Sequence, residues 1–273
     1  MPTEMLQPVI LGIVQGLGEF LPISSTAHLI LVPYFFNWSD PGLAFDVALH
    51  FGTLIAVLAY FWKDWLAIFE SAFQIKLSPK NLKLSSYNYS QSMPGFLIIT
   101  TLPAVLAGYF LESLAETRFR NPLLIAVTLA LFGLILYLID KYYPKDKDLS
   151  HLNIKNSIFV GICQAVAIIP GISRSGATIS ASRFMGFNQE SAARFSFLLS
   201  TPVILGAVIF KIEYLISAFS QPSLLWAIIV SAISGYLAIK YLLKFIKNYD
   251  YTVFFWYRLV VAIIIVFIYF QLR

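Results

Sequence analysis

The chain has 273 residues, of which 59% are hydrophobic and only 12% are charged. Soluble domains typically carry about 25% charged residues, so this composition excludes a soluble globular protein and predicts an all-α integral membrane protein. The formal net charge of +5 does not indicate nucleic-acid binding, because the basic residues lie in short loops between apolar segments, as in membrane proteins with oriented loops.

Six segments are apolar and long enough to cross a bilayer, which takes about 20 residues. We expect these transmembrane helices at 44–62, 93–111, 122–140, 195–216, 223–243 and 253–271. Two further apolar segments, 5–36 and 157–186, are interrupted by Pro22 and by the pair Pro170-Gly171. Each half is too short to span a bilayer alone, so each segment predicts a re-entrant helix hairpin.

The two interrupted segments resemble each other in sequence. The stretch from Gly12 to His28 aligns without gaps with the stretch that starts at Gly161, so that Gly12 matches Gly161 and Ser24 matches Ser173. A hairpin followed by three spans makes one repeat. Because three spans cross the membrane an odd number of times, the second repeat starts on the opposite face of the membrane. We therefore predict an inverted-topology repeat whose two hairpins meet near the bilayer midplane.

These repeats cover approximately 1–142 and 150–273, and together they form a single membrane domain, 1–273. The positive-inside rule sets its orientation, because one set of loops is much richer in lysine. That set comprises Lys63, Lys76, Lys80, Lys83, Lys141, Lys145, Lys147, Lys155, Lys244 and Lys247. The lysine-rich side is therefore expected in the cytoplasm, and the first hairpin is expected to enter from outside, which favours a cavity open to the extracytoplasmic side.

We call the interruptions at Pro22 and at Pro170-Gly171 the first and second breaks. Polar residues follow the first break. Ser24, Ser25 and Thr26 can cap a new half-helix, whose free N–H groups and positive dipole end bind phosphate readily. His28 falls on the same helical face as Ser24 and Ser25. Glu19 is an intramembrane carboxylate, which is costly and typical of function. It is expected either to bind a hard cation such as Mg²⁺ or Ca²⁺ or to act as a general acid or base.

The second break supplies a positive charge. Arg174 has a planar fork suited to phosphate oxygens, and we expect it to pair with Glu19 until an anion arrives. The flanking residues that can contact an anion are Ser173, Ser175, Gly176 and Thr178. Arg258, inside the last apolar segment, either joins this phosphate cluster or extends to the membrane interface.

Asp46 and His50 share a helical face at the start of the first span. We interpret them as a satisfied pair at the membrane interface, with the mouth of the cavity as the alternative. The polar residues at the breaks together indicate a receptor for a dense anion at membrane depth. A lipid phosphate or diphosphate fits these hydrophobic surroundings better than a soluble metabolite.

Four motifs resemble those of the bacterial undecaprenyl-diphosphate phosphatase family of the bacitracin-resistance type. They run from Gln15 to His28, from Pro170 to Thr178, from Ala193 to Pro202, and over Tyr257-Arg258. The resemblance covers essentially the whole chain. It implies hydrolysis of undecaprenyl diphosphate to undecaprenyl phosphate and inorganic phosphate in the bacterial cell membrane, which recycles the cell-wall lipid carrier and confers bacitracin resistance.

The same resemblance implies a divalent cation, Mg²⁺ or Ca²⁺, held by Glu19 and Gln15. Many family members have Glu at the position of Gln15, so the cation depends more heavily on Glu19 here. The spacing favours a mechanism in which Arg174 holds the diphosphate and Ser25 attacks the terminal phosphorus, with His28 moving the proton. Water or His28 as the nucleophile stays open.

A transporter is the competing class, because inverted repeats and half-helix ends that face an anion are also devices of transporters. Such a protein would move undecaprenyl phosphate between leaflets with the same anion site. The partners expected in either case are a polyprenyl diphosphate lipid and the membrane, with assembly into a homodimer left open.

Overall fold

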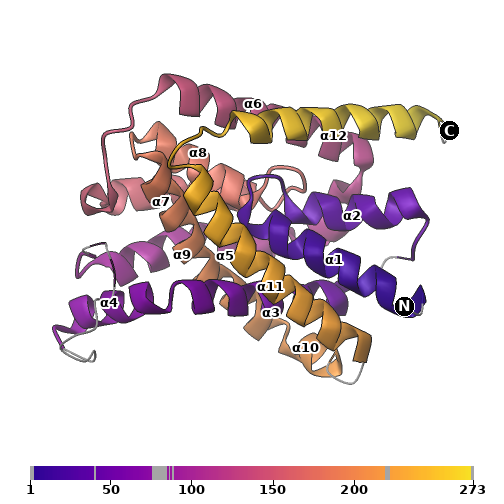
Figure 1. Ribbon diagram of the computed structural model, residues 1–273, viewed down its shortest axis with the longest axis horizontal. Coiled ribbons are helices and arrows are strands. Elements are labelled where there is room, and N and C mark those ends of the chain that lie inside the picture. Colours follow the sequence, from indigo (N-terminus) through magenta and orange to yellow (C-terminus); the bar gives the residue numbers. More distant parts are fainter. Residues whose placement is uncertain are drawn as a thin grey trace.

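The protein is all-helical across the part that a computed structural model describes, which comprises residues 3–39, 41–75, 85, 87, 89–218 and 222–271 (Figure 1). Lys76, Lys80 and Lys83, which contributed to the predicted orientation, lie outside the described residues. The first half contains α1 (Thr3–Phe20), α2 (Ser25–Phe36), α3 (Leu43–Tyr60), α4 (Trp62–Phe73), α5 (Met93–Glu116) and α6 (Pro122–Tyr142). The second half contains α7 (Ile154–Val166), α8 (Arg174–Phe184), α9 (Gln189–Phe210), α10 (Ile212–Ala218), α11 (Pro222–Phe245) and α12 (Thr252–Gln271).

Six of these helices are long and apolar enough to cross a membrane: α3, α5, α6, α9, α11 and α12. The predicted spans agree with them to within a few residues, except for the fourth. That span was predicted at 195–216, but α9 covers Gln189–Phe210 and a separate short helix follows it. The helix begins earlier because the Asn188 side chain caps it by accepting a hydrogen bond from the Ser191 N–H.

The early start of α9 places Arg194 well inside the helix, where it pairs with Asp64 of α4. The Tyr89 hydroxyl donates a second hydrogen bond to Asp64, at 2.6 Å. Burial, reinforced by the charge of Asp64, raises the pKa of this hydroxyl, so it stays protonated and able to donate. The cluster ties α4 and the chain before α5 to α9.

Each of the two interrupted segments forms a helix pair that packs against a helix from the other half of the chain. The first pair, α1 and α2, packs through α1 on α11, whereas the second pair, α7 and α8, packs through α7 on α5. Figure 1 shows α1 and α2 toward the end of the molecule that carries the N and C labels, and α7 and α8 toward the other end. The two breaks therefore meet in the middle of the bundle.

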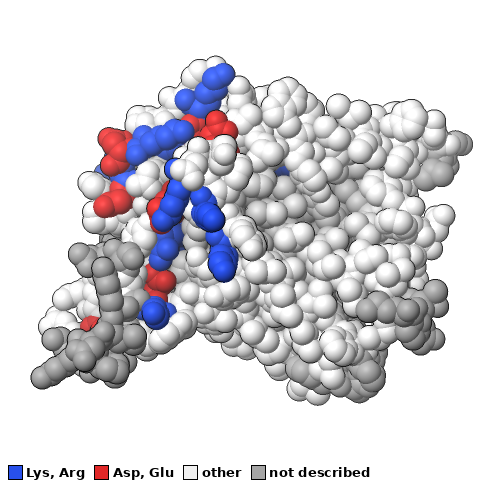
Figure 2. All heavy atoms as spheres, viewed as in Figure 1, with Lys and Arg blue, Asp and Glu red and all other residues white. Residues whose placement is uncertain are grey.

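Exposed lysines gather at one end of the molecule, where α6 leads into α7 and α11 leads into α12 (Figure 2). Lys145, Lys147, Lys244 and Lys247 are all exposed there. Most of the remaining surface in this view is uncharged, as expected for helices that face lipid.

Glycines allow the helices to approach closely. A Cβ atom at Gly12 would lie 2.8 Å from the Ala227 carbonyl oxygen, and one at Gly161 would lie 2.8 Å from the Thr100 carbonyl oxygen. These are the two glycines that align in the sequence repeat. The tightest approach is at Gly16, where a Cβ would lie 1.9 Å from Ser234 Oγ and 2.6 Å from backbone atoms of α11.

We predict that Gly16→Ala destabilises the protein because α1 and α11 must separate. Overpacking of this kind typically costs about 1–3 kcal/mol, which corresponds to a melting temperature lower by roughly 2–10 °C for a chain of this size. Thermal unfolding of the purified protein in detergent measures the shift. Gly95→Ala is the matched control, because nothing lies within 4 Å of a Cβ there; an equal shift in both variants would contradict the packing argument.

Candidate active site

Two half-helices begin at the centre of the bundle with the same unusual backbone conformation. Ser24 precedes α2 and Ser173 precedes α8, with φ angles of 75° and 73°. This left-handed region costs a residue other than glycine about 1–3 kcal/mol. The Ser24 Oγ accepts a hydrogen bond from the Ala27 N–H, and the Ser173 Oγ accepts one from the Gly176 N–H. Both serines therefore act as N-caps, and Ser25 and Arg174 become the first residues of their helices.

Each break satisfies the backbone groups that the other leaves free. The Gly171 N–H donates to the Ser24 Oγ at 3.1 Å, and the Ser175 Oγ donates to the Leu21 carbonyl oxygen at 3.1 Å. Thr128 of α6 donates its hydroxyl to the Pro170 carbonyl oxygen at 2.7 Å. These contacts hold the two helix N-termini next to each other.

Arg258 lies behind the breaks and is fully buried. Its guanidinium donates to the Pro22 carbonyl oxygen of the first break and to the carbonyl oxygens of Gly171 and Ile172 in the second. The side chain therefore fastens the two breaks together and does not extend to the membrane interface. Its Nη atoms are directed at these carbonyl groups, whereas its Nε is buried without a hydrogen-bond partner among the described residues. Its direct contact with phosphate stays a prediction.

A cavity of about 160 Å³ lies in front of the two helix N-termini. Its wall is formed by Gly18, Glu19, Ser24, Ser25, Thr26, His50, Ala167, Ser173, Arg174, Val203, Ile204 and Ala207. The cavity thus brings together the carboxylate and hydroxyls of the first break and the arginine of the second. Gly18 is required beneath it, because a Cβ there would lie 2.8 Å from Ser25 Cα.

Glu19 is the centre of the polar contacts in this cavity. Its Oε2 accepts hydrogen bonds from the Ser25 hydroxyl at 2.9 Å and from Gln15 Nε2 at 3.1 Å. Its Oε1 pairs with Arg174 Nη2 at 3.2 Å, so the expected ion pair is present. Ser25 is the hydroxyl in contact with the carboxylate, whereas the Ser24 hydroxyl oxygen is occupied by two backbone N–H groups.

Arg174 is held in position from α9 as well as from Glu19. Its Nη1 donates to the Ser196 carbonyl oxygen at 3.1 Å, whereas its Nε is buried without a hydrogen-bond partner among the described residues. The hydroxyl of Thr178, one turn further along α8, lies within hydrogen-bond distance of the Arg174 carbonyl oxygen and of Ser196 Oγ. The guanidinium is therefore ordered and still has an N–H available.

The predicted anion contacts divide into two groups. Thr26 and Ser173 line the cavity. Ser175 and Thr178 are fully buried, and their hydroxyls form hydrogen bonds with protein oxygens. The Gly176 N–H donates to the Ser173 hydroxyl oxygen. Their role as substrate contacts stays a prediction, because their polar atoms already have partners within the protein.

The two histidines near the breaks differ in their contacts with the cavity residues. The Nδ1 of His28 lies 2.8 Å from the Ser24 carbonyl oxygen, and its Nε2 lies 2.7 Å from the Tyr257 hydroxyl. Both ring nitrogens therefore have partners other than Ser25. His50 lines the cavity, which agrees with the alternative interpretation of Asp46 and His50, and its Nε2 lies 3.7 Å from Glu19 Oε2. The signal available in the sequence was an ionisable residue within an apolar span.

The residues fit a divalent cation only in part. No group of three or more His, Cys, Asp or Glu side chains suited to a metal ion occurs among the described residues. The Oε1 atom of Gln15, whose Nε2 contacts the Glu19 carboxylate, is nevertheless buried without a partner among the described residues. Magnesium is often held by one or two carboxylates together with substrate phosphates. The donor set fits an ion that binds together with a phosphate group.

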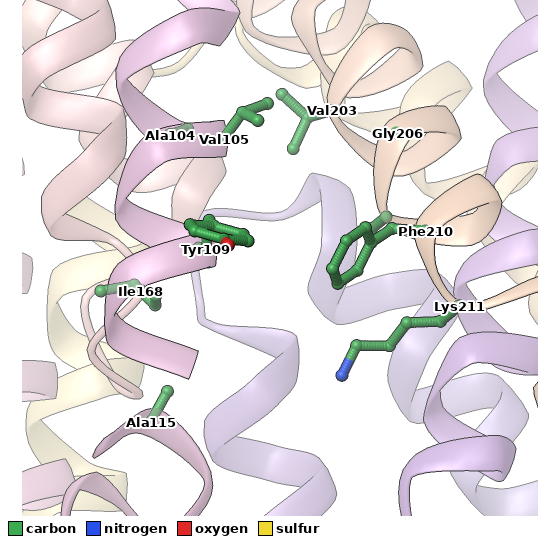
Figure 3. A pocket seen from close by; sticks show the side chains of 11 residues that line it. Ala104, Val105, Tyr109, Ala115, Ile168, Val203, Gly206, Phe210 and Lys211 are labelled. Atoms are coloured by element: carbon green, nitrogen blue, oxygen red, sulfur yellow. The ribbon is translucent and has the colours of Figure 1, made fainter. Parts of the chain in front are cut away.

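An apolar groove adjoins the polar cavity. It has a volume of about 450 Å³ and shares Val203 and Ala207 with the cavity. Figure 3 shows it between α5 and α9, with Tyr109 on one side, Phe210 on the other and Lys211 near its end. A dense polar site that continues into an apolar groove suits an amphiphile with a charged head.

The fold defines a multi-pass membrane protein with a polar cavity between its helices. Residues 8–264 match the family described as bacitracin resistance protein BacA, so the chain belongs to that family.

The chain is also similar to proteins named undecaprenyl-diphosphatase. It is 43% identical over 262 residues to one from Pelotomaculum thermopropionicum, with 96% of each chain covered. It is 46% identical over 266 residues to one from Moorella thermoacetica, covering 96% of this chain and 97% of the relative. A third, from Caldicellulosiruptor bescii, is 44% identical over 264 residues, with 95% of each covered.

We predict that Arg258→Met lowers stability by several kcal/mol, because it leaves three carbonyl groups at the breaks without their donor and each buried orphan costs about 1–3 kcal/mol. Thermal unfolding in detergent would register this as a marked fall in melting temperature. Arg118→Met, at an exposed arginine, is the control and should change stability little. Similar melting temperatures for the two variants would contradict the role assigned to Arg258.

Proposed function

We propose that the chain is an undecaprenyl-diphosphate phosphatase, which releases inorganic phosphate from the lipid diphosphate and leaves undecaprenyl phosphate for another round of cell-wall synthesis. The observation that carries this proposal is that Glu19 accepts a hydrogen bond from the Ser25 hydroxyl and also pairs with Arg174. Ser25 and Arg174 are the first residues of the two helices, α2 and α8, that begin at the cavity. The names of the relatives point to the same reaction, and they do not favour the transporter alternative.

The diphosphate would bind in the polar cavity and the prenyl chain would leave through the apolar groove. The N-termini of α2 and α8, with their positive dipole ends, and the guanidinium of Arg174 suit phosphate oxygens. The groove between α5 and α9 suits the first isoprene units, and the rest of the chain would lie among lipid.

The Ser25 hydroxyl is the proposed nucleophile. Its Oγ attacks the terminal phosphorus, and Glu19 Oε2, at 2.9 Å, accepts the proton. The new bond joins Oγ to phosphorus, the bond from phosphorus to the bridging oxygen breaks, and undecaprenyl phosphate departs with that oxygen. Water then attacks the phosphoserine and releases inorganic phosphate and the free Ser25 hydroxyl. Transfer of the first proton to His28, the expectation from spacing, lacks a supporting contact.

A divalent cation, Mg²⁺ or Ca²⁺, is part of the proposal. Glu19 and the free amide oxygen of Gln15 would hold it. It would offset the negative charge of the diphosphate, and Arg174 would share that task.

The proposed topology is an inverted repeat in the bacterial cell membrane, with re-entrant pairs α1–α2 and α7–α8 that enter from opposite faces. Three observations support it: the crosswise packing of α1 on α11 and α7 on α5, the equivalent close approaches at Gly12 and Gly161, and the matching caps Ser24 and Ser173. The lysine-rich end would face the cytoplasm, and the cavity would open to the extracytoplasmic side. Assembly into a homodimer stays a prediction.

We predict that Ser25→Ala lowers phosphate release from undecaprenyl diphosphate by at least about a thousand-fold, because no other hydroxyl contacts Glu19 among the described residues. The assay uses purified protein in detergent, where translocation between compartments cannot produce phosphate. Ser150→Ala, at an exposed loop serine, is the control. Near-normal turnover by Ser25→Ala would exclude the proposed nucleophile.

We predict that Gly206→Trp selectively impairs the long-chain substrate. Nothing lies within 4 Å of a Cβ at Gly206, so the indole would occupy the groove without displacing the backbone. The ratio of kcat/KM for undecaprenyl diphosphate to that for methyl diphosphate, which has no isoprene unit to place in the groove, should fall about tenfold or more. Gly95→Trp, outside the groove, should leave the ratio unchanged, and an unchanged ratio in Gly206→Trp would place the prenyl chain elsewhere.

A further inference from the structure

His50 is the one histidine among the described residues that lines the polar cavity. It projects from α3, and its side chain is 29% exposed, opposite Glu19, whose side chain is 7% exposed. Neither the proposed nucleophile nor the proposed phosphate contacts include it. An imidazole in contact with the space that the diphosphate would fill therefore lacks an assigned role.

The backbone fixes which nitrogen of His50 carries the proton. Nδ1 lies 2.7 Å from the carbonyl oxygen of Asp46, and a carbonyl can only accept a hydrogen bond. Nδ1 therefore carries a hydrogen, and Nε2 is the nitrogen on the side of Glu19, where the ring has its lone pair when it is neutral. A histidine that binds a metal ion through one ring nitrogen commonly donates its other N–H to a carbonyl group, as Nδ1 of His50 does.

The distance between the two facing atoms suits an ion between them. His50 Nε2 and Glu19 Oε2 are 3.7 Å apart, which is beyond hydrogen-bond range. Two ligand atoms of one ion are about 3.0–3.6 Å apart for bonds near 2.1 Å, and up to about 3.7 Å for the longer bonds of calcium. The pair needs only a small adjustment to bind one ion jointly.

Gln15 supplies a third donor atom at the same carboxylate. Its Nε2 contacts Glu19 Oε2, whereas its Oε1 is buried and has no partner in the described part of the chain. Rotation of the amide by half a turn exchanges the two atoms, and such amide orientations are assigned from surrounding contacts. The turned amide would direct Oε1 to the position beside Glu19 Oε2, so that two oxygens and the imidazole nitrogen converge.

We infer that His50 binds the divalent cation through Nε2, together with Glu19 and Gln15. This inference rests on the cation component of the proposed function and adds a nitrogen ligand to it. Imidazole suits transition-metal ions better than magnesium or calcium. The chain should therefore bind Mn²⁺ more tightly than Mg²⁺, with phosphate oxygens of the substrate completing the coordination.

Pulsed electron paramagnetic resonance of bound Mn²⁺ tests the inference without reference to activity. A directly bonded imidazole nitrogen couples to the metal electron spin, whereas carboxylate, amide and phosphate oxygens give no such signal. The chain contains three histidines, so the double variant His28→Gln/His151→Gln leaves His50 as its only imidazole. The full chain, purified with a histidine-free tag, is measured with Mn²⁺ alone and with added inorganic phosphate.

We expect the nitrogen coupling in the wild type and in the double variant, and its loss in His50→Gln together with a Kd for Mn²⁺ at least about tenfold higher. If the double variant loses the coupling, if His50→Gln keeps it, or if the wild type binds no Mn²⁺, the inference is wrong. The double variant decides the question even if His50→Gln does not fold.

Phosphate release in saturating Mg²⁺ separates this result from the proposed function. Wild-type hydrolysis without nitrogen coupling would overturn the role of His50 and leave the phosphatase intact. Absence of hydrolysis in the wild type would overturn the phosphatase, whatever the metal signal shows.

Discussion

The structure depends on one constraint: two helices that stop inside an apolar bundle leave backbone polar groups that must find partners without water. The two breaks solve this jointly, because the Gly171 N–H donates to the Ser24 hydroxyl oxygen and Arg258 donates to carbonyl groups of both. Neither break is satisfied on its own. The requirement to pair the breaks therefore also brings the N-termini of α2 and α8 to one point, which is the proposed binding site of the diphosphate.

The repeated scaffold carries unequal chemistry in its two copies. Ser24 and Ser173 adopt the same backbone conformation and cap their helices in the same way. The next residue differs: Ser25 contacts the carboxylate, and Arg174 provides the cation that pairs with it. Gln15 and Gln164 also align, yet Gln15 contacts Glu19 whereas Gln164 bonds to the Thr100 carbonyl oxygen in the α5–α7 packing. In the proposed mechanism the first copy supplies the nucleophile and the proton acceptor, and the second supplies the arginine that would bind phosphate.

Much of this could be predicted from sequence because the informative signals are local. Apolar length identifies the spans, prolines mark the breaks, and charges within apolar segments mark Glu19 and Arg174. Spacing along one helix could not determine which side chains meet across helices. His28 shares a helical face with the serines, but contact with Tyr257, distant in sequence, draws its ring away from Ser25. The start of α9 was also misjudged, because the cap at Asn188 precedes the apolar run.

The position of His50 follows from the same long-range geometry. It belongs to α3, which packs against α9 and α11, so its place opposite Glu19 of α1 depends on the packing of four helices and not on any motif. The bond from Nδ1 to the Asp46 carbonyl oxygen then orients the ring along its own helix. A residue that the sequence alone suggests is interfacial therefore forms part of the cavity wall in the folded protein. Intramembrane histidines outside the recognised motifs accordingly merit the same attention as those within them.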